Sequence, residues 1–258
     1  MTVRVYQATA RNFSAETENR IHSDEVAAEF GFAGALVPGA AIFGHMTRPL
    51  LDALGTNWLS NWRADVRFLK PAYDGDALTI HHEAQGEEHC VRCQARGLVL
   101  AELTTSPSGS DGPPSAVDPG LTPELRPEIR WDNVEIGEPF PAWTWTPDTV
   151  ANAESAAQVE DDLSCYRDGV IHPHAILSTA NRTLTRRYQL PAWIHVGSNL
   201  RFRRLLRIGD EIGVRTVPRR KWRHKGHEFV ELRINYVVEG MVATEIGHVA
   251  IFRIRGSN

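Results

Sequence analysis

Three polar side chains that could transfer a proton or orient a water molecule fall close together early in the chain. His22 follows Glu18 and Asn19 within the stretch ETENRIHSD. The pKa of a histidine lies near neutrality, and beside a carboxylate or an amide its ring can hold a water molecule and act as both base and acid. The pattern predicts that His22 is an acid/base residue and that Glu18 or Asn19 orients it and the water.

A second chemical feature follows, where the turn Val37-Pro38-Gly39 opens a helical pattern. Proline is common at the start of a helix, where the backbone N–H groups have no partner inside the helix. Such N–H groups stabilise an oxygen that gains negative charge. Gly39 has no side chain, so a ligand could approach its backbone closely. We therefore expect the Gly39 N–H to bind that oxygen.

Each of these residues also has a structural interpretation. His22 could be a solvent-facing residue before a helix that Ser23 or Asp24 caps. Glu18 could be a surface carboxylate, and Asn19 could bond its own backbone in a turn. Gly39 could do no more than relieve crowding.

A cluster of histidines and cysteines in HHEAQGEEHCVRC is compatible with zinc binding by residue type. However, the adjacent His81 and His82 would point to opposite faces of a strand. Cys90 and Cys93 would do the same, and no second Cys-x-x-Cys follows. We therefore predict no metal site, and no feature of the sequence indicates a cofactor.

The composition is that of an ordinary globular protein. The 258 residues are 42% hydrophobic and 23% charged, and the net charge of −4 gives no basic excess that would favour nucleic acid. Three cysteines make no disulfide framework. The sequence shows no signal-peptide core and no apolar window long enough to span a membrane. We expect a cytoplasmic protein that binds neither nucleic acid nor membranes.

A segment rich in proline, glycine and serine, SPSGSDGPPSAVDPGLTPELRP, divides the chain into halves of similar size. The halves share a pattern: Pro38 lies 20 residues before Trp58, and Pro173 lies 20 residues before Trp193. In each half an Arg-Phe pair then precedes a Gly-Asp turn at the same spacing. We predict two copies of one unit, at residues 1–105 and 129–258, joined by a linker at 106–128.

Each copy has a helix followed by strands. The first helix is expected from Gly39 to Leu54, with an apolar residue at every fourth position and Gly55 ending it. Alternating segments such as FVELRINYVV indicate antiparallel strands after each helix. A helix with one apolar stripe must pack against a sheet. The predicted class is α+β, with a central helix wrapped by an antiparallel sheet in each copy.

These residues resemble the hot-dog fold of MaoC-like (R)-specific enoyl-thioester hydratases and dehydratases. In TENRIHSDEVAAEFGF, Asn19, Ile21, His22 and Asp24 stand in the family's motif positions. In GALVPGAAIFG, Gly39 stands where the family carries its helix-start glycine. Thr17 replaces the family's aspartate and Arg20 its proline. The second half has no such motif, and its His172 and His174 lie at the start of the helix instead.

The resemblance implies a double hot-dog that interconverts 2-enoyl and (3R)-3-hydroxyacyl thioesters of CoA or acyl carrier protein. It also implies that the second half is a degenerate copy shaping the acyl pocket, and it is compatible with a homodimer of double hot-dogs. Two other functions fit the same fold. One is a thioesterase, which would use a carboxylate such as Glu18 with a helix N-terminus. The other is a non-catalytic subunit that binds acyl thioesters.

Overall fold

A computed structural model of the chain describes residues 2–109, 112, 114–122 and 125–256. Parts of the expected linker 106–128 therefore lie outside the described residues. In the first half the elements are β1 (Thr2–Thr9), α1 (Asp24–Glu29), α2 (Gly39–Leu54), α3 (Trp58–Asn61), β2 (Trp62–Phe68), β3 (Ala77–Gln85), β4 (Glu88–Ala95) and β5 (Leu98–Pro107). In the second half they are β6 (Trp143–Trp145), α4 (Thr149–Ala157), α5 (Ser164–Arg167), α6 (Pro173–Arg187), β7 (Ile194–Phe202), β8 (Ile212–His224), β9 (His227–Val238) and β10 (Met241–Arg253).

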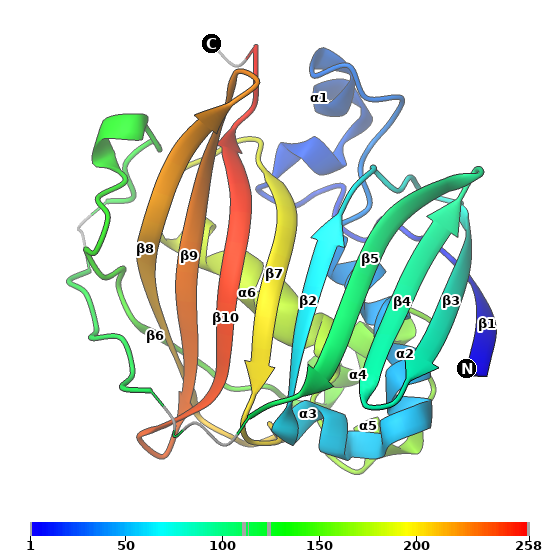
Figure 1. The fold of residues 1–258 in the computed structure, drawn as a ribbon. Helices are drawn as coiled ribbons and strands as arrows, with labels where there is room; N and C mark the ends of the chain where they lie inside the picture. Colours follow the sequence, from blue (N-terminus) through cyan, green and yellow to red (C-terminus); the bar gives the residue numbers. More distant parts are fainter. Residues whose placement is uncertain (1, 110–111, 113, 123–124, 257–258) are drawn as a thin grey trace.

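The ten strands of the described residues form one antiparallel sheet, in the order β1-β3-β4-β5-β2-β7-β10-β9-β8-β6. The two long helices α2 and α6 lie together on one side of this sheet (Figure 1). Each half therefore supplies one central helix and one half of the sheet. This arrangement agrees with the α+β class and the two helix-and-sheet copies expected from the sequence.

The helix α2 has the bounds that its sequence predicts. It begins at Gly39, passes through Pro49 and ends before Gly55, whose φ of 63° lies in the left-handed region that glycine tolerates. Ile42, Met46 and Leu50 are all buried, as the four-residue spacing requires. The stripe packs α2 onto the inner face of the sheet and fixes where its N-terminus lies.

The two halves meet at the pair β2–β7, which is shorter than the strands that form it. Its register runs from Arg63 opposite Arg201 to Arg67 opposite Gly197. Beyond Gly197, the first residues of β7 pair only with β10. The last residue of β2 and the first residues of β7 are thus not paired with each other.

The expected linker begins inside β5, which runs to Pro107, and a later part of it lies against the second half. The Val117 N–H donates to Asn235 Oδ1 at 3.0 Å, and the Arg233 guanidinium donates to the Ser115 carbonyl at 3.1 Å. Both partners belong to β9. These contacts bury Asn235 completely. The segment is therefore packed on the outer face of the sheet.

Candidate functional site

The segment that carries His22 is held against the second half of the chain. The segment forms a 3₁₀ turn, Arg20–His22, and Ile21 is 1% exposed within it. Ile21 packs in a small apolar cluster with Ala192, Ile251 and other residues. The Arg20 N–H donates to the Pro191 carbonyl at 2.7 Å. Burial of Ile21 thus fixes the turn beside the start of β7.

Asn19 joins the two halves through its side-chain amide. Its Oδ1 accepts from the Trp193 N–H at 3.0 Å, and its Nδ2 donates to the Trp193 carbonyl at 3.1 Å. The same Nδ2 lies 3.2 Å from His22 Nε2. The structure thus brings Asn19 and His22 together, and Asn19 also fixes the backbone before β7.

The hydrogen bonds of His22 determine which ring nitrogen carries the proton. Nδ1 lies 2.7 Å from the Leu36 carbonyl, which can only accept, so Nδ1 is the donor. Nε2 is then the nitrogen with a lone pair and accepts from Asn19. Burial lowers the pKa of His22, partly opposed by the bond to Leu36. The ring is therefore neutral at pH 7, with the lone pair of Nε2 directed at the Asn19 amide.

Gly39 lies at the N-terminus of α2, beside the ring of Phe68. The N–H groups of Gly39 and Ala40 find no partner among the described residues. A Cβ at position 39 would lie 2.8 Å from Phe68 Cε2, so only glycine lets this ring pack against the helix start. The free N–H is the feature expected from the sequence, and the absence of a side chain serves the Phe68 contact.

These residues line one cavity of about 220 Å³, at the place where β2 and β7 separate. Its walls are mainly apolar and come from the His22 segment, the start of α2, the residues after β2 and the start of β7. The lining residues include Asn19, His22, Leu36, Gly39, Ile42, Phe68, Lys70, Leu100, Asn181, Trp193, Ile194, His195 and Val196.

Two residues that the motif comparison singled out lie outside this lining. Glu18 is exposed and accepts from Arg126 at 2.9 and 3.0 Å through its two carboxylate oxygens. Thr17 is exposed, and its hydroxyl donates to the Ser14 carbonyl at 2.8 Å. No carboxylate is found among the lining residues of the described chain. Of the four candidate residues, the structure therefore gathers His22, Asn19 and Gly39 but not Glu18.

Four polar residues of the cavity were missed by the sequence reasoning: Lys70, which follows β2, and three residues of the second half. Trp193 immediately precedes β7, His195 is the second residue of β7, and Asn181 lies on α6. Trp193 did stand out as a repeat position, and His195 follows it by two residues. That spacing was the one signal that could have pointed to His195.

Comparison with solved structures gives the fold its name. A Chloroflexus aurantiacus protein assigned as a MaoC domain dehydratase matches with a TM-score of 0.67 and 14% identity, covering 99% of this chain and 95% of that one. A Mycobacterium tuberculosis protein described as having a double hot-dog fold matches with a TM-score of 0.62 and 14% identity, covering 97% and 96%. The fold is a double hot-dog.

A Lactobacillus plantarum protein assigned as an oleoyl thioesterase also matches, with a TM-score of 0.57 and 10% identity over 99% of this chain and 96% of that one. No family model and no curated protein matches the sequence. The resemblance to MaoC-like proteins is thus confirmed for the fold, which dehydratases and thioesterases share.

The second half of the double hot-dog has its own polar cluster, at the start of α6. Asp161 Oδ2 lies 3.2 Å from His172 Nε2 and accepts from the Tyr166 hydroxyl at 3.0 Å. Asp161 Oδ1 accepts from Arg48 at 3.1 Å. His172 Nδ1 accepts from the His174 N–H at 3.0 Å. The side chains at this helix start are bonded to one another.

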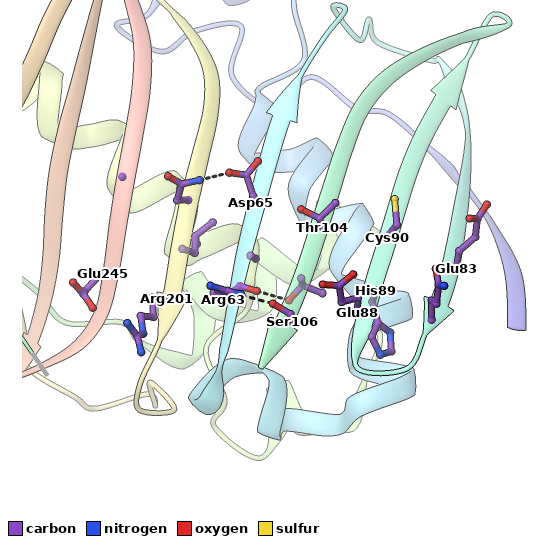
Figure 2. Close-up of a pocket in the computed structure, with 16 residues that line it drawn as sticks. Arg63, Asp65, Glu83, Glu88, His89, Cys90, Thr104, Ser106, Arg201 and Glu245 are labelled. Carbon is purple, nitrogen blue, oxygen red and sulfur yellow. Dashed lines mark hydrogen bonds between the residues drawn. The ribbon is translucent and has the colours of Figure 1, made fainter. Parts of the chain in front are cut away.

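A larger hollow, of about 760 Å³, lies on the sheet face turned away from the helices (Figure 2). Its charged and polar side chains are largely paired, as Arg63 with Ser106 at 3.0 Å and Asp65 with Asn199. It contains neither His22 nor a helix N-terminus. We therefore place the candidate site in the smaller cavity.

Neither a metal cluster nor a membrane-spanning helix is evident in the described parts of the chain. No group of three or more His, Cys, Asp or Glu side chains there is arranged to hold an ion. His82 and His89 are buried, and His82 Nε2 lies 2.8 Å from His89 Nδ1, but no third ligand joins them among the described residues. Among the described helices, none combines the length and the apolarity that crossing a bilayer requires.

Proposed function

We propose that the protein hydrates 2-enoyl thioesters, and dehydrates (3R)-3-hydroxyacyl thioesters, of CoA or acyl carrier protein. The observation that carries the proposal is the pairing of two groups in one cavity. His22 has its Nδ1–H bonded to Leu36, and its Nε2 has a lone pair that accepts from Asn19 and acts as the base once a water takes the place of that donor. The start of α2 supplies an unpaired Gly39 N–H to the same space.

Hydration of an enoyl thioester needs a base for the water, a donor for the carbonyl oxygen and an acid for the α-carbon. His22 Nε2 takes one proton as the water oxygen bonds to C3. The electrons of the C2=C3 bond move toward the thioester oxygen, where the Gly39 N–H and the positive end of α2 stabilise the charge. His22 then returns its proton to C2.

The residues around the cavity favour hydration over thioester hydrolysis. A hot-dog thioesterase of the kind considered above would place a carboxylate near the helix N-terminus. The lining that the structure describes has a histidine there and no carboxylate, and Glu18 is paired with Arg126. The thioesterase and the acyl-binding subunit remain as outcomes of the test.

The test follows the ultraviolet absorbance of crotonyl-CoA and of a longer enoyl-CoA after addition of the protein. We expect the absorbance to fall, and His22→Ala to slow this by at least about 100-fold, since acid–base catalysis typically contributes that much. His224→Ala, which removes an exposed histidine at the end of β8, is the matched control.

Release of free CoA thiol in step with the absorbance loss would show a thioesterase instead. Binding of both thioesters without turnover would show an acyl-binding subunit. Equal turnover by His22→Ala and by the parent protein would remove His22 from the site.

A further inference from the structure

Three residues that line the cavity from the second half each have a buried polar atom without a hydrogen-bond partner among the residues described. In the described chain, His195 Nδ1, Trp193 Nε1 and Asn181 Oδ1 are buried and accept or donate no hydrogen bond. All three residues line the cavity. A buried polar group left unpaired costs about 1–3 kcal/mol, so such a wall suits a ligand that can form hydrogen bonds.

A β-bulge explains why His195 faces inward. Along a regular strand, residues three apart lie on opposite faces. His195 and Ser198 are nevertheless both buried and bonded to each other, because β7 and β10 slip in register between Val249 and Ala250. The slip brings the imidazole of His195 onto the face that packs toward the helices.

A chain of hydrogen bonds fixes the tautomer of His195. Its Nε2 lies 3.2 Å from the Gly197 carbonyl, which only accepts, so Nε2 carries the proton. Nε2 also lies 2.9 Å from Ser198 Oγ, which in turn lies 3.1 Å from His248 Nδ1. Burial lowers the pKa of His195 and keeps the ring neutral. Nδ1 is therefore a lone-pair acceptor without a donor.

His195 lies close to His22, the proposed base. Asn19 contacts both His22 Nε2 and the backbone of Trp193, two residues before His195. Two residues of extended strand span roughly 7 Å. The ring of Phe68, which packs on Gly39, also contacts His195 at 4.8 Å between ring centroids. His22, the start of α2 and His195 thus surround one small space.

We propose that His195 Nδ1 accepts a hydrogen bond from the hydroxyl group that the reaction adds or removes, or from the water that becomes it. This inference rests on the proposed function. When one O–H bond of the water breaks toward His22 Nε2, the other O–H remains and donates to His195. The hydroxyl of the (3R)-3-hydroxyacyl product keeps that bond. His195 thus supplies an acceptor where the exposed Thr17 supplies none.

The experiment compares the binding of (3R)-3-hydroxybutyryl-CoA and butyryl-CoA by calorimetry. The two ligands differ only in the hydroxyl group. We expect the parent protein to bind the hydroxy compound about fivefold to tenfold more tightly, as one hydrogen bond of about 1 kcal/mol gives. His195→Gln keeps a donor toward Ser198 at the end of its side chain but has no acceptor at the position of Nδ1, so it should abolish this preference and slow hydration about tenfold or more.

His82→Gln, which removes a buried histidine outside the cavity, should leave the preference unchanged. Should His195→Gln fail to fold, ¹⁵N spectroscopy of the histidine rings in the parent protein replaces it. One unprotonated ring nitrogen should then shift with the hydroxy ligand but not with butyryl-CoA.

Two outcomes separate this inference from the proposed function. The role of His195 is overturned if folded His195→Gln still binds the hydroxy ligand more tightly than butyryl-CoA. It is also overturned if the ¹⁵N spectrum responds equally to both ligands. In either case turnover that depends on His22 would still support the proposed function. If the protein shows no turnover but still prefers the hydroxy ligand, and this preference requires His195, the hydratase function is wrong. The cavity is then a binding site for hydroxyacyl thioesters.

Discussion

The N-terminal ends of α2 and α6 occupy equivalent places in the two halves, yet they differ in what their backbone can still bind. At α2 the N–H groups of Gly39 and Ala40 have no partner among the described residues, and Gly39 lines a cavity. At α6 the first residue is Pro173, which has no N–H, and the N–H of the next residue, His174, donates to His172 Nδ1. The start of α6 thus has no donor to offer at its first two positions.

The carboxylates before the two helices differ in the same sense. Glu18, before α2, is exposed and pairs with Arg126 at the surface. Asp161, before α6, is buried and bonded to His172, Tyr166 and Arg48. The comparison teaches that a helix N-terminus becomes a site only where the chain leaves it unfilled, whereas the second copy uses the same position for stability.

The largest expected effect is the response of the α6 start to acid. Burial lowers the pKa of His174 to about 4 and also lowers the pKa of His172, and it lowers the pKa of His45, which lies on α2 near this cluster, to about 4. The unfolded chain binds these protons first, so stability is full above pH 6.5 and is lost as the pH falls toward 4. Each histidine adds about 1.4 kcal/mol per pH unit to this loss.

Urea unfolding at pH 7, 6 and 5 measures this loss. In the variant His174→Gln the free energy of unfolding should fall less steeply with decreasing pH, by about the contribution of one histidine. A free energy of unfolding that stays level from pH 7 to pH 5 would contradict the stabilising role of these neutral histidines.

A substitution at Asp161 should separate stability from activity. Burial alone would raise the pKa of Asp161, but its bonds, above all to His172, lower it, so the carboxylate is charged in the fold. Asp161→Ala leaves His172, Tyr166 and Arg48 without their acceptor. Because Arg48 is partly exposed, we expect a loss of about 3 kcal/mol, at the low end for a broken buried pair.

Chemical unfolding measures that loss, and crotonyl-CoA hydration at low temperature should remain within about threefold of the parent rate. A large fall in the rate of the folded variant would mean that the start of α6 takes part in the chemistry.

The smallest effect in stability is expected at the start of α2. In Gly39→Ala the added methyl displaces the ring of Phe68, with an overpacking cost of about 1–2 kcal/mol. Activity should fall further, by about tenfold or more, because the ring and the helix start both line the cavity.

Gly44→Ala is the matched control, since its methyl would meet His174 at 2.9 Å, where α2 and α6 pack. It should cost similar stability and spare the catalytic rate. Equal losses of activity in Gly39→Ala and Gly44→Ala would contradict a special role for the start of α2 in catalysis.

The sequence predicted those parts of the fold that local signals determine. Pro38-Gly39 and Gly55 mark the ends of α2, and the repeat of Pro, Trp and Gly-Asp marks the two copies. The strand β1 and the β2–β7 junction were not predicted, because strand pairing depends on contacts between residues far apart in the chain.

The candidate site was only partly accessible to the same reasoning. The motif positions located His22, Asn19 and Gly39. Spacing could not tell that Glu18 turns outward to Arg126, since either orientation fits a surface turn. His195 escaped because its importance lies in an unpaired Nδ1 and a bulge in β7, and neither has a sequence signature.

The pairing of β2 with β7 within one polypeptide also bears on how the two helix starts could diverge. In a dimer of identical chains, every substitution appears at both sites, so filling one helix start with a histidine fills the other. Here the two helix starts are encoded separately and yet share one sheet. Pro173 and His172 can therefore occupy the second helix start while Gly39 leaves the first open, since a single mutation alters one helix start and leaves its counterpart intact.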